Sequence, residues 1–264
     1  MEVKDSVIVV TGGGSGIGAA LCRRFAAEGA KAVVVVDLNG DNAETVAAEI
    51  GGTARRVDVS SEEEIVALID FVESEIGPID LFCSNAGIGL GRGLEATNEQ
   101  WETIMAVNVY AHVYAARHLV PRMAARGGGY LMNTASAAGL LSQIGSVTYA
   151  VTKHAAVSFA EWVSITHGNE GIKVSVLAPQ AVNTPMIAGS EAGGVAGVDG
   201  VIEPEQLADT VMEGLRDERF LILPHPVVGD YMQRKASDVD RWLGGMRKLA
   251  DRYGEQAVAG AIDE

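Results

Sequence analysis

The sequence predicts an α/β protein in which helices cover both faces of a parallel, doubly wound sheet of about seven strands. Short runs rich in β-branched residues alternate along the chain with longer segments of helical periodicity. The strand-like runs are continuously apolar, as in residues 32–36 (AVVVV), which is typical of strands buried on both faces. With 264 residues, 48% of them hydrophobic, the chain can bury one large core, so we expect a single domain over residues 1–264.

The first predicted unit is a strand, a loop, a helix and a second strand. Residues 6–10 form a short apolar run that ends in the glycine-rich residues 11–18, and apolar residues at helical spacing follow. Gly29 ends this helix, and residues 32–36 form the second strand, which Asp37 closes. This βαβ unit spans about 30 residues, the usual length of the motif.

The remaining segments continue the alternation. We expect further strands over residues 53–57, 79–84, 130–134, 173–178 and 219–223, and helices over residues 41–50, 61–76, 101–126, 147–166, 204–216 and 237–252. Residues 186–200 follow the sixth strand, are rich in Gly and Ala and lack strong periodicity. Sheets of this kind open towards their ligand at that point, so we expect a mobile substrate lid there.

Charge and composition exclude several classes of partner. Twenty Lys and Arg residues against 35 Asp and Glu residues give a formal net charge of -15, which repels nucleic acids and anionic membranes. No apolar run is long enough for a membrane span, and no N-terminal stretch resembles a signal peptide, so we expect a cytoplasmic protein. Cys22 and Cys83 lie in apolar patterns and are expected in the core; the scattered His and Cys residues predict no metal site.

The glycine-rich loop of residues 11–18 (TGGGSGIG) follows a strand and opens a helix. In that context glycines let the backbone approach a pyrophosphate at the helix N-terminus, as in dinucleotide-binding proteins. The loop alone leaves two alternatives open, which are a flexible turn between strand and helix and the related loop of a methyltransferase.

Asp37 makes the dinucleotide interpretation more specific. It lies 19 positions after Gly18 (37 minus 18), at the end of the second strand, where a carboxylate can accept the hydroxyls of an adenosine ribose. A 2′-phosphate would meet like charge there, and no Arg or Lys lies in the loop or just after Asp37. The position therefore favours NAD over NADP, with a simple strand-end cap as the alternative.

Tyr149 and Lys153 lie four residues apart in a predicted helix, so their side chains share one face. An unperturbed tyrosine titrates near 10, so a tyrosine base at neutral pH needs a shift of about 3 units, or about 4 kcal/mol. Lys153 and the positive charge of an oxidised nicotinamide could supply it. Ser136 ends a strand 13 residues earlier (149 minus 136) and can donate to the same substrate oxygen. Asn108, within a helical segment, would by itself be a surface or kink residue.

These motifs together resemble the short-chain dehydrogenase/reductase family, whose members have a Rossmann-type fold, and the resemblance runs from about residue 6 to residue 184. It implies that Asp58 and Val59 bind the adenine and that Asn85, Ala86 and Gly87 support the cofactor. The full cofactor site implied is Gly12, Ser15, Gly16, Ile17, Gly18, Asp37, Leu38, Asp58, Val59, Asn85, Ala86, Gly87, Tyr149, Lys153, Pro179, Val182 and Thr184.

The same resemblance implies the catalytic roles. Tyr149 would be the general acid/base, and Ser136 would orient the substrate oxygen. Lys153 would hold the nicotinamide ribose and depress the pKa of the tyrosine, and Asn108 would bind a proton-relay water. The implied substrate contacts are Ser136, Gln143, Tyr149 and Gln180.

Gln180 departs from the family pattern. The family usually has Pro-Gly-x-Val-x-Thr after the sixth strand, whereas this chain has Pro-Gln-Ala-Val-Asn-Thr over residues 179–184. A glutamine side chain could hydrogen-bond the substrate or narrow the pocket, and a glycine that needs positive φ would resist the change, so the turn could differ. Nearby His225 could border the site or lie in a surface loop, and His154 is expected to be structural.

We therefore expect an NAD-dependent oxidoreductase that interconverts a secondary alcohol and a ketone on a small, largely apolar substrate, with oxidation the favoured direction. One alternative is a non-catalytic NAD-binding regulatory protein of the same fold, and another is a methyltransferase. The resemblance also implies a homo-oligomer, a tetramer or dimer, that pairs through helices around residues 110–126 and 147–166.

Overall fold

The computed structural model describes residues 1–90, 93–188 and 191–253 of the chain. Its centre is one sheet of seven strands that are all parallel, in the order β3-β2-β1-β4-β5-β6-β7. The strands are β1 (Val7–Thr11), β2 (Ala32–Asp37), β3 (Thr53–Arg56), β4 (Leu81–Ser84), β5 (Gly129–Thr134), β6 (Ile172–Leu177) and β7 (Leu221–Ile222). The strand order reverses direction between β1 and β4, which confirms the predicted doubly wound sheet.

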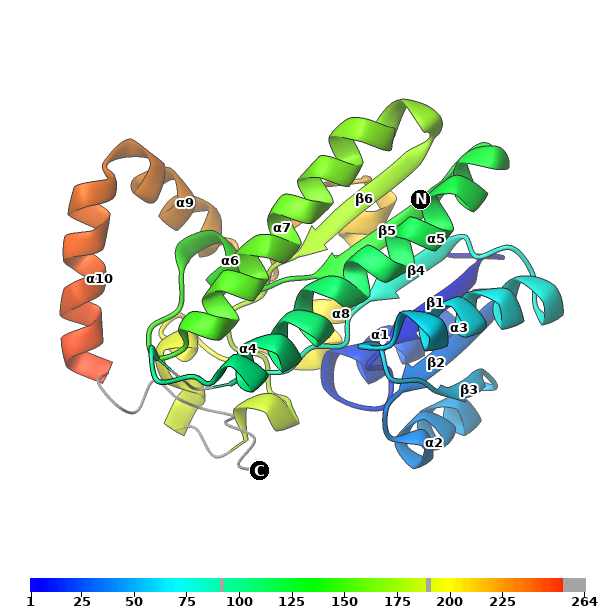
Figure 1. The fold of residues 1–264 in the computed structure, drawn as a ribbon, viewed down its shortest axis with the longest axis horizontal. Coiled ribbons are helices and arrows are strands. Elements are labelled where there is room, and N and C mark those ends of the chain that lie inside the picture. Colours follow the sequence, from blue (N-terminus) through cyan, green and yellow to red (C-terminus); the bar gives the residue numbers. More distant parts are fainter. Residues whose placement is uncertain (91–92, 189–190, 254–264) are drawn as a thin grey trace.

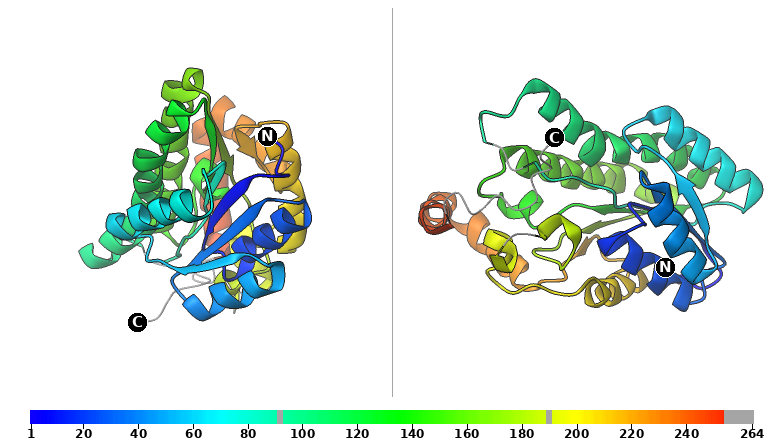
Figure 2. Two further views of the ribbon diagram at one scale, coloured as in Figure 1. Left: turned by 90° about the vertical axis from the view of Figure 1, so that its right-hand side faces the viewer. Right: turned by 90° about the horizontal axis from the view of Figure 1, so that it is seen from below.

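Helices cover both faces of the sheet, as predicted (Figures 1 and 2). On one face lie α3 (Glu62–Glu75), α4 (Asn98–Met105), α5 (Ala111–Ala125) and α7 (Val147–His167), with a π-helical turn, η1 (Ala106–Tyr110), between α4 and α5. On the other face lie α1 (Gly16–Ala27), α2 (Gly40–Ile50) and α8 (Pro204–Arg216).

The strands divide their side chains between two cores because successive residues of a strand point to opposite faces. In β1, Val7 and Val9 join the core under α3, α5 and α7, whereas Ile8 and Val10 join the core under α1, α2 and α8. Cys22 and Cys83 are fully buried, so the expectation that they are core residues is confirmed; burial raises the pKa of Cys22 to about 12.

The C-terminal part differs from the prediction of one amphipathic helix over residues 237–252. It contains two helices, α9 (Val227–Ser237) and α10 (Val239–Tyr253). Val228 of α9 is buried in a small cluster with Ala137 and Leu141, the latter from the short helix α6 (Ala138–Leu141). No residue of α10 is buried, and Figure 1 shows this helix at the edge of the molecule, beyond α9.

The segment that we expected to be a substrate lid, residues 186–200, is more ordered locally than its composition suggests. It contains most of the 3₁₀ turn η3 (Pro185–Ile187) and the 3₁₀ turns of η4 (Glu191–Gly197), while residues 189–190 lie outside the described part. The backbone N–H of Ala181 donates to the carbonyl of Ala196 at 3.2 Å, which attaches this segment to the end of β6.

Candidate active site

A cavity of about 670 Å³ opens at the carboxyl ends of the strands, where the strand order reverses between β1 and β4. Every residue that the sequence analysis assigned to the cofactor lines it, from Gly12 in the glycine loop to Thr184 after β6. Ser136, Gln143 and Gln180 line it as well. The parallel topology therefore brings together side chains that are far apart in the sequence.

The glycine loop fits a closely approaching phosphate group. A Cβ on Gly18 would lie 2.0 Å from the carbonyl oxygen of Gly12, so no other residue fits without moving the backbone. Gly16 has φ +48, in the left-handed region that favours glycine. The first turn of α1 carries no acidic residue, and the side chain of Ser15 makes no capping hydrogen bond. The positive end of α1 is thus available to an anion.

Asp37 lies at the end of β2 and faces this loop. Its Oδ2 accepts a hydrogen bond from the N–H of Gly14 at 2.9 Å, and its Oδ1 accepts from the N–H of Asn39 at 3.0 Å. These two hydrogen bonds stabilise the glycine loop and the turn after β2. Asp37 also lines the cavity, next to the exposed Leu38. Among the described residues that line the cavity, Lys153 is the only Lys or Arg.

Asp58 and Val59 line the part of the cavity that is expected to receive the adenine. Asp58 Oδ1 accepts from the N–H of Ser60 at 2.9 Å and from its hydroxyl at 2.7 Å. The backbone N–H of Asp58 donates to Glu64 Oε2 at 2.7 Å. These bonds fix the turn that carries Asp58, while Val59 is buried.

Asn85 connects the ends of three strands. Its Nδ2 donates to the carbonyl of Thr11 at 3.0 Å, its backbone N–H donates to Thr11 Oγ1 at 2.9 Å, and its Oδ1 accepts from Thr134 Oγ1 at 3.0 Å. The sequence analysis assigned no role to Thr11 or Thr134. Both are buried strand-end residues, on the two strands β1 and β5 that flank β4, and a hydroxyl at the end of each strand is the only sequence signal that could have indicated them.

The structure brings Tyr149, Lys153 and Ser136 together beside the same cavity. Helix α7 starts just before Tyr149 because Ser146, its N-cap, accepts the N–H of Tyr149. One turn later, Lys153 extends its buried side chain so that Nζ donates to the carbonyl of Thr134 at 2.9 Å and lies 5.5 Å from the centre of the Tyr149 ring.

Burial sets the ionisation of this pair. It lowers the pKa of Lys153 from 10.5 to about 8, because a buried ammonium loses hydration. Burial raises the pKa of Tyr149, and a hydrogen bond from Ser136 acts in the opposite direction. In the protein alone the phenol is therefore protonated at neutral pH, and the tyrosine needs an additional positive charge nearby to become a base.

Asn108 is buried within the π-helical turn η1, so the alternative that it is a surface residue is wrong. Its Oδ1 accepts from the N–H of Ile88 at 2.9 Å, and its Nδ2 donates to the carbonyl of Ile88 at 2.9 Å and to Thr152 Oγ1 at 3.2 Å. Asn108 thus joins the loop after β4 to helix α7.

Gln180 replaces the usual glycine without backbone strain, since its φ is not positive. Its N–H donates to Nδ1 of His225 at 3.2 Å, and its Nε2 donates to Oδ2 of Asp199 at 2.8 Å. Tyr231 of α9 donates its hydroxyl hydrogen to the other carboxylate oxygen of Asp199 at 2.9 Å. The sequence analysis assigned no role to Asp199 or Tyr231.

The two histidines considered in the sequence analysis are also placed. His225 is buried, so the alternative that it lies in a surface loop is wrong. His154 contacts its own helix, through the carbonyl of Ala150.

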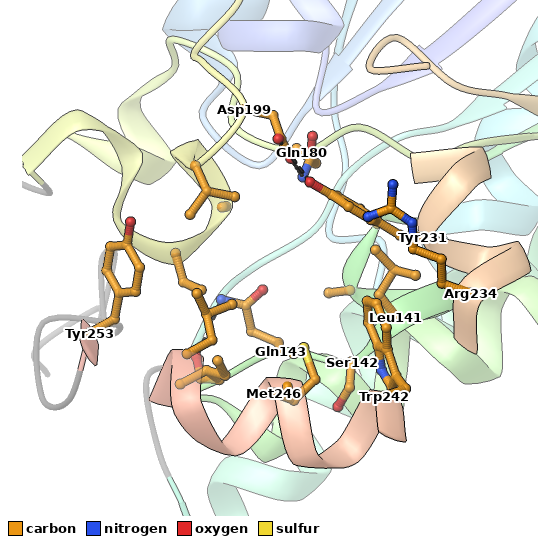
Figure 3. A pocket seen from close by; sticks show the side chains of 18 of the residues that line it. Leu141, Ser142, Gln143, Gln180, Asp199, Tyr231, Arg234, Trp242, Met246 and Tyr253 are labelled. Carbon is orange, nitrogen blue, oxygen red and sulfur yellow. Dashed lines mark hydrogen bonds between the residues drawn. The ribbon is translucent and has the colours of Figure 1, made fainter. Parts of the chain in front are cut away.

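A second cavity of about 930 Å³ adjoins the first and shares Ser136, Gln143 and Gln180 with it. Its walls come from α6, the residues of η4, α9 and α10 (Figure 3). Figure 3 shows Gln180, Asp199 and Tyr231 along one side of this space and Leu141, Trp242 and Met246 along another. The two cavities meet beside Ser136, which is where a substrate and a cofactor could react.

A sequence model of the family described as short chain dehydrogenase matches residues 6–193. The chain belongs to this family. The resemblance found in the sequence is therefore confirmed, and the protein is an oxidoreductase of the short-chain dehydrogenase type. Within the described residues of this dehydrogenase, no helix is long and apolar enough to cross a membrane, and no group of three or more His, Cys, Asp or Glu could hold a metal ion.

Named relatives of this short-chain dehydrogenase come from several organisms. It is 38% identical over 231 residues to 1-deoxy-11-beta-hydroxypentalenate dehydrogenase of Streptomyces exfoliatus, a match that covers 84% of each chain. It is 32% identical over 193 residues to meso-2,3-butanediol dehydrogenase of Serratia marcescens, covering 72% of this chain and 76% of the other. A short chain dehydrogenase/reductase from Burkholderia phymatum in complex with NAD has a TM-score of 0.82 and 27% identity, covering 91% of this chain and 96% of that one.

Proposed function

We propose that this short-chain dehydrogenase interconverts a secondary alcohol and a ketone, with NAD as the hydride acceptor and Tyr149 as the general acid/base. The observation that carries the proposal is that Tyr149 and Lys153 line the first cavity together with Ser136, which also lines the second. A non-catalytic regulator would not need these groups, and the chain has all of them together with Asn108.

The preference for NAD rests on the carboxylate of Asp37. It lines the cavity within hydrogen-bonding reach of the glycine loop, and a 2′-phosphate placed there would be repelled. Among the described residues, no Arg lines the cavity there to offset the negative charge of Asp37. Solved structures with NAD, from Burkholderia phymatum, and with NADH, from Brucella melitensis, support the choice among similar folds.

Each residue of the site has a separate role in the proposed reaction. When bound, NAD supplies an acceptor for the hydride that leaves the carbinol carbon, and its positive charge favours the phenolate of Tyr149. The phenolate takes the hydroxyl proton as the carbonyl forms, while the Ser136 hydroxyl donates to the same oxygen. The Lys153 ammonium, held by the Thr134 carbonyl, adds a further positive charge beside the tyrosine.

The second cavity favours a substrate with an apolar body. Leu141, Ile144, Val195, Trp242 and Met246 contribute to its walls. Its volume of about 930 Å³ lies in the range of small-molecule sites. The names of similar proteins include dehydrogenases for hydroxypentalenate and for 2,3-butanediol, which support a secondary alcohol as substrate. Residues 186–200 would form one wall of the second cavity and act as the lid over the substrate.

Self-association through α5 and α7 is part of the same proposal. Helix α7 exposes large apolar side chains, at 45% for Val151, 57% for Trp162 and 82% for Ile165, and Tyr110, at the end of η1 just before α5, is 45% exposed. Such a surface suits burial between subunits, and sedimentation would distinguish a dimer or tetramer from a monomer.

The test follows the absorbance of reduced nicotinamide with purified protein, a panel of secondary alcohols and ketones, and NAD and NADP in parallel. We expect turnover with NAD and little with NADP. Asp37→Asn keeps an oxygen acceptor for Gly14 but removes the charge, so the preference for NAD should fall by about tenfold. A preference for NADP in the unchanged protein would contradict the cofactor assignment.

A further inference from the structure

The C-terminal helix α10 directs its apolar side chains into the second cavity. Trp242, Met246, Leu249 and Tyr253 follow each other at spacings of four, three and four residues, which places them on one face of a helix, and all four line the cavity. No residue of α10 is buried in the core. The family match ends at residue 193, so this wall belongs to the part of the chain outside it.

Arginines surround the same space without carboxylate partners. Arg234 of α9, and Arg241 and Arg252 of α10, line the cavity and form no salt bridge within the described part of the chain. Seven other arginines pair with acidic side chains, namely Arg23, Arg24, Arg117, Arg122, Arg126, Arg216 and Arg219, while Arg55, Arg56 and Arg247 form no salt bridge in the described part and do not line the cavity. Three of the arginines without a salt bridge therefore gather around one largely apolar cavity, in a protein with a formal net charge of -15.

The two carboxylates that line the cavity already have partners. Asp199 accepts from Gln180 at 2.8 Å and from Tyr231 at 2.9 Å. Asp238 accepts from the backbone N–H of Arg241 at 2.9 Å, at the start of α10. Three arginine charges against these two acidic charges leave a single positive charge around the cavity, which suits a monoanion better than a phosphate dianion.

We infer that this cavity recognises a carboxylate, and that the substrate is an apolar secondary alcohol or ketone whose hydrocarbon body lies against α10 while its carboxylate pairs with Arg234 and Arg241. This inference rests on the proposed function for the identity of the cavity as the substrate site. Guanidinium groups bind carboxylates through paired N–H donors, and the apolar walls exclude water from the rest of the ligand. Figure 3 shows Arg234 beside Tyr231, on the side of the cavity where Gln180 and Asp199 also lie.

The test measures binding by calorimetry at low ionic strength, so that it does not depend on turnover. The probes are two rigid hydrocarbon acids of different size, adamantane-1-carboxylate and lithocholate, each compared with its uncharged primary amide. The protein is the full chain with NAD present. We expect at least one acid to bind about tenfold more tightly than its amide, as for one hydrogen-bonded charge pair.

Two variants assign the effect to the arginines. The double variant R234Q/R241Q should bind acid and amide equally, whereas R247Q, on α10 but away from the cavity lining, should keep the preference. Unchanged melting temperatures would show that all variants fold. Equal affinity for acids and amides in the unchanged protein, no binding of either acid, or a preference that survives in R234Q/R241Q would overturn the inference. Turnover of neutral alcohols with NAD in that case would leave the proposed function intact.

Discussion

The ammonium of Lys153 donates a 2.9 Å hydrogen bond to the backbone carbonyl of Thr134, although the two residues are 19 positions apart in the sequence. This bond joins helix α7 to the end of strand β5. Thr134 also donates from its hydroxyl to Asn85, so the same strand end holds both a residue of the proposed cofactor site and the lysine proposed to be catalytic. The position of Lys153 therefore follows from the sheet as much as from its own helix.

Replacing Lys153 with Met should change the pH dependence of the reaction. Without the ammonium, the pKa of Tyr149, which burial already raises, should rise further, because a nearby positive charge favours the phenolate. The rate at neutral pH should fall by about 100-fold or more and recover in part towards pH 10. Lys235→Met is a matched control, since Lys235 also donates to a carbonyl, that of Leu140 at 2.7 Å, outside the site. An unchanged pH profile in Lys153→Met would contradict this role.

Gly18→Ala should abolish dinucleotide binding and destabilise the fold. The new Cβ would lie 2.0 Å from the carbonyl oxygen of Gly12, which forces the loop to move. The expected loss is about 1–3 kcal/mol of unfolding free energy from overpacking, measured by urea denaturation. Gly168→Ala is the control, because its Cβ would meet nothing within 4 Å and its φ of -58 is ordinary. Equal unfolding free energies for the two variants would contradict this prediction, because the contact between the new Cβ and the Gly12 carbonyl would then cost no stability.

His112 should make the fold sensitive to acid. Burial, and secondarily the charge of Lys153, lowers its pKa from 6.5 to about 3, so the folded protein keeps this ring neutral while the unfolded chain binds a proton. The unfolding free energy should therefore fall by about 1.4 kcal/mol per pH unit as pH drops from 6.5 towards 3. Urea denaturation at pH 7 and pH 5 should show a smaller difference in His112→Gln. Parallel pH dependence in the two proteins would argue against a neutral buried ring.

Much of this arrangement was predictable because parallel strands and long helices leave strong patterns. The helix predicted over residues 147–166 is observed as α7 at Val147–His167, and the residues expected at the cofactor all line one cavity. The alternation of elements fixes which ends of the strands meet, so residues placed at those ends must gather.

Other features depend on contacts that no local pattern reports. Helix α9 was missed because Pro224 and Pro226 indicate a loop, whereas Pro226 serves as the N-cap and Val228 is buried against α6. The burial of Asn108 depends on hydrogen bonds to Ile88, and the partners of Gln180 lie 19 and 45 residues further along the chain. Such long-range pairs have no periodicity, so only the folded structure reveals them.

The most direct test of the central claim compares the unchanged protein with Tyr149→Phe in the nicotinamide absorbance assay, on a secondary alcohol that the unchanged protein oxidises with NAD. Removing one hydroxyl should lower kcat by about 10²–10⁴-fold, the usual contribution of a positioned acid/base. The rise in melting temperature that NAD induces should stay, which shows that the cofactor still binds. A kcat within a few fold of the unchanged protein would contradict the account, because proton transfer would then not depend on Tyr149.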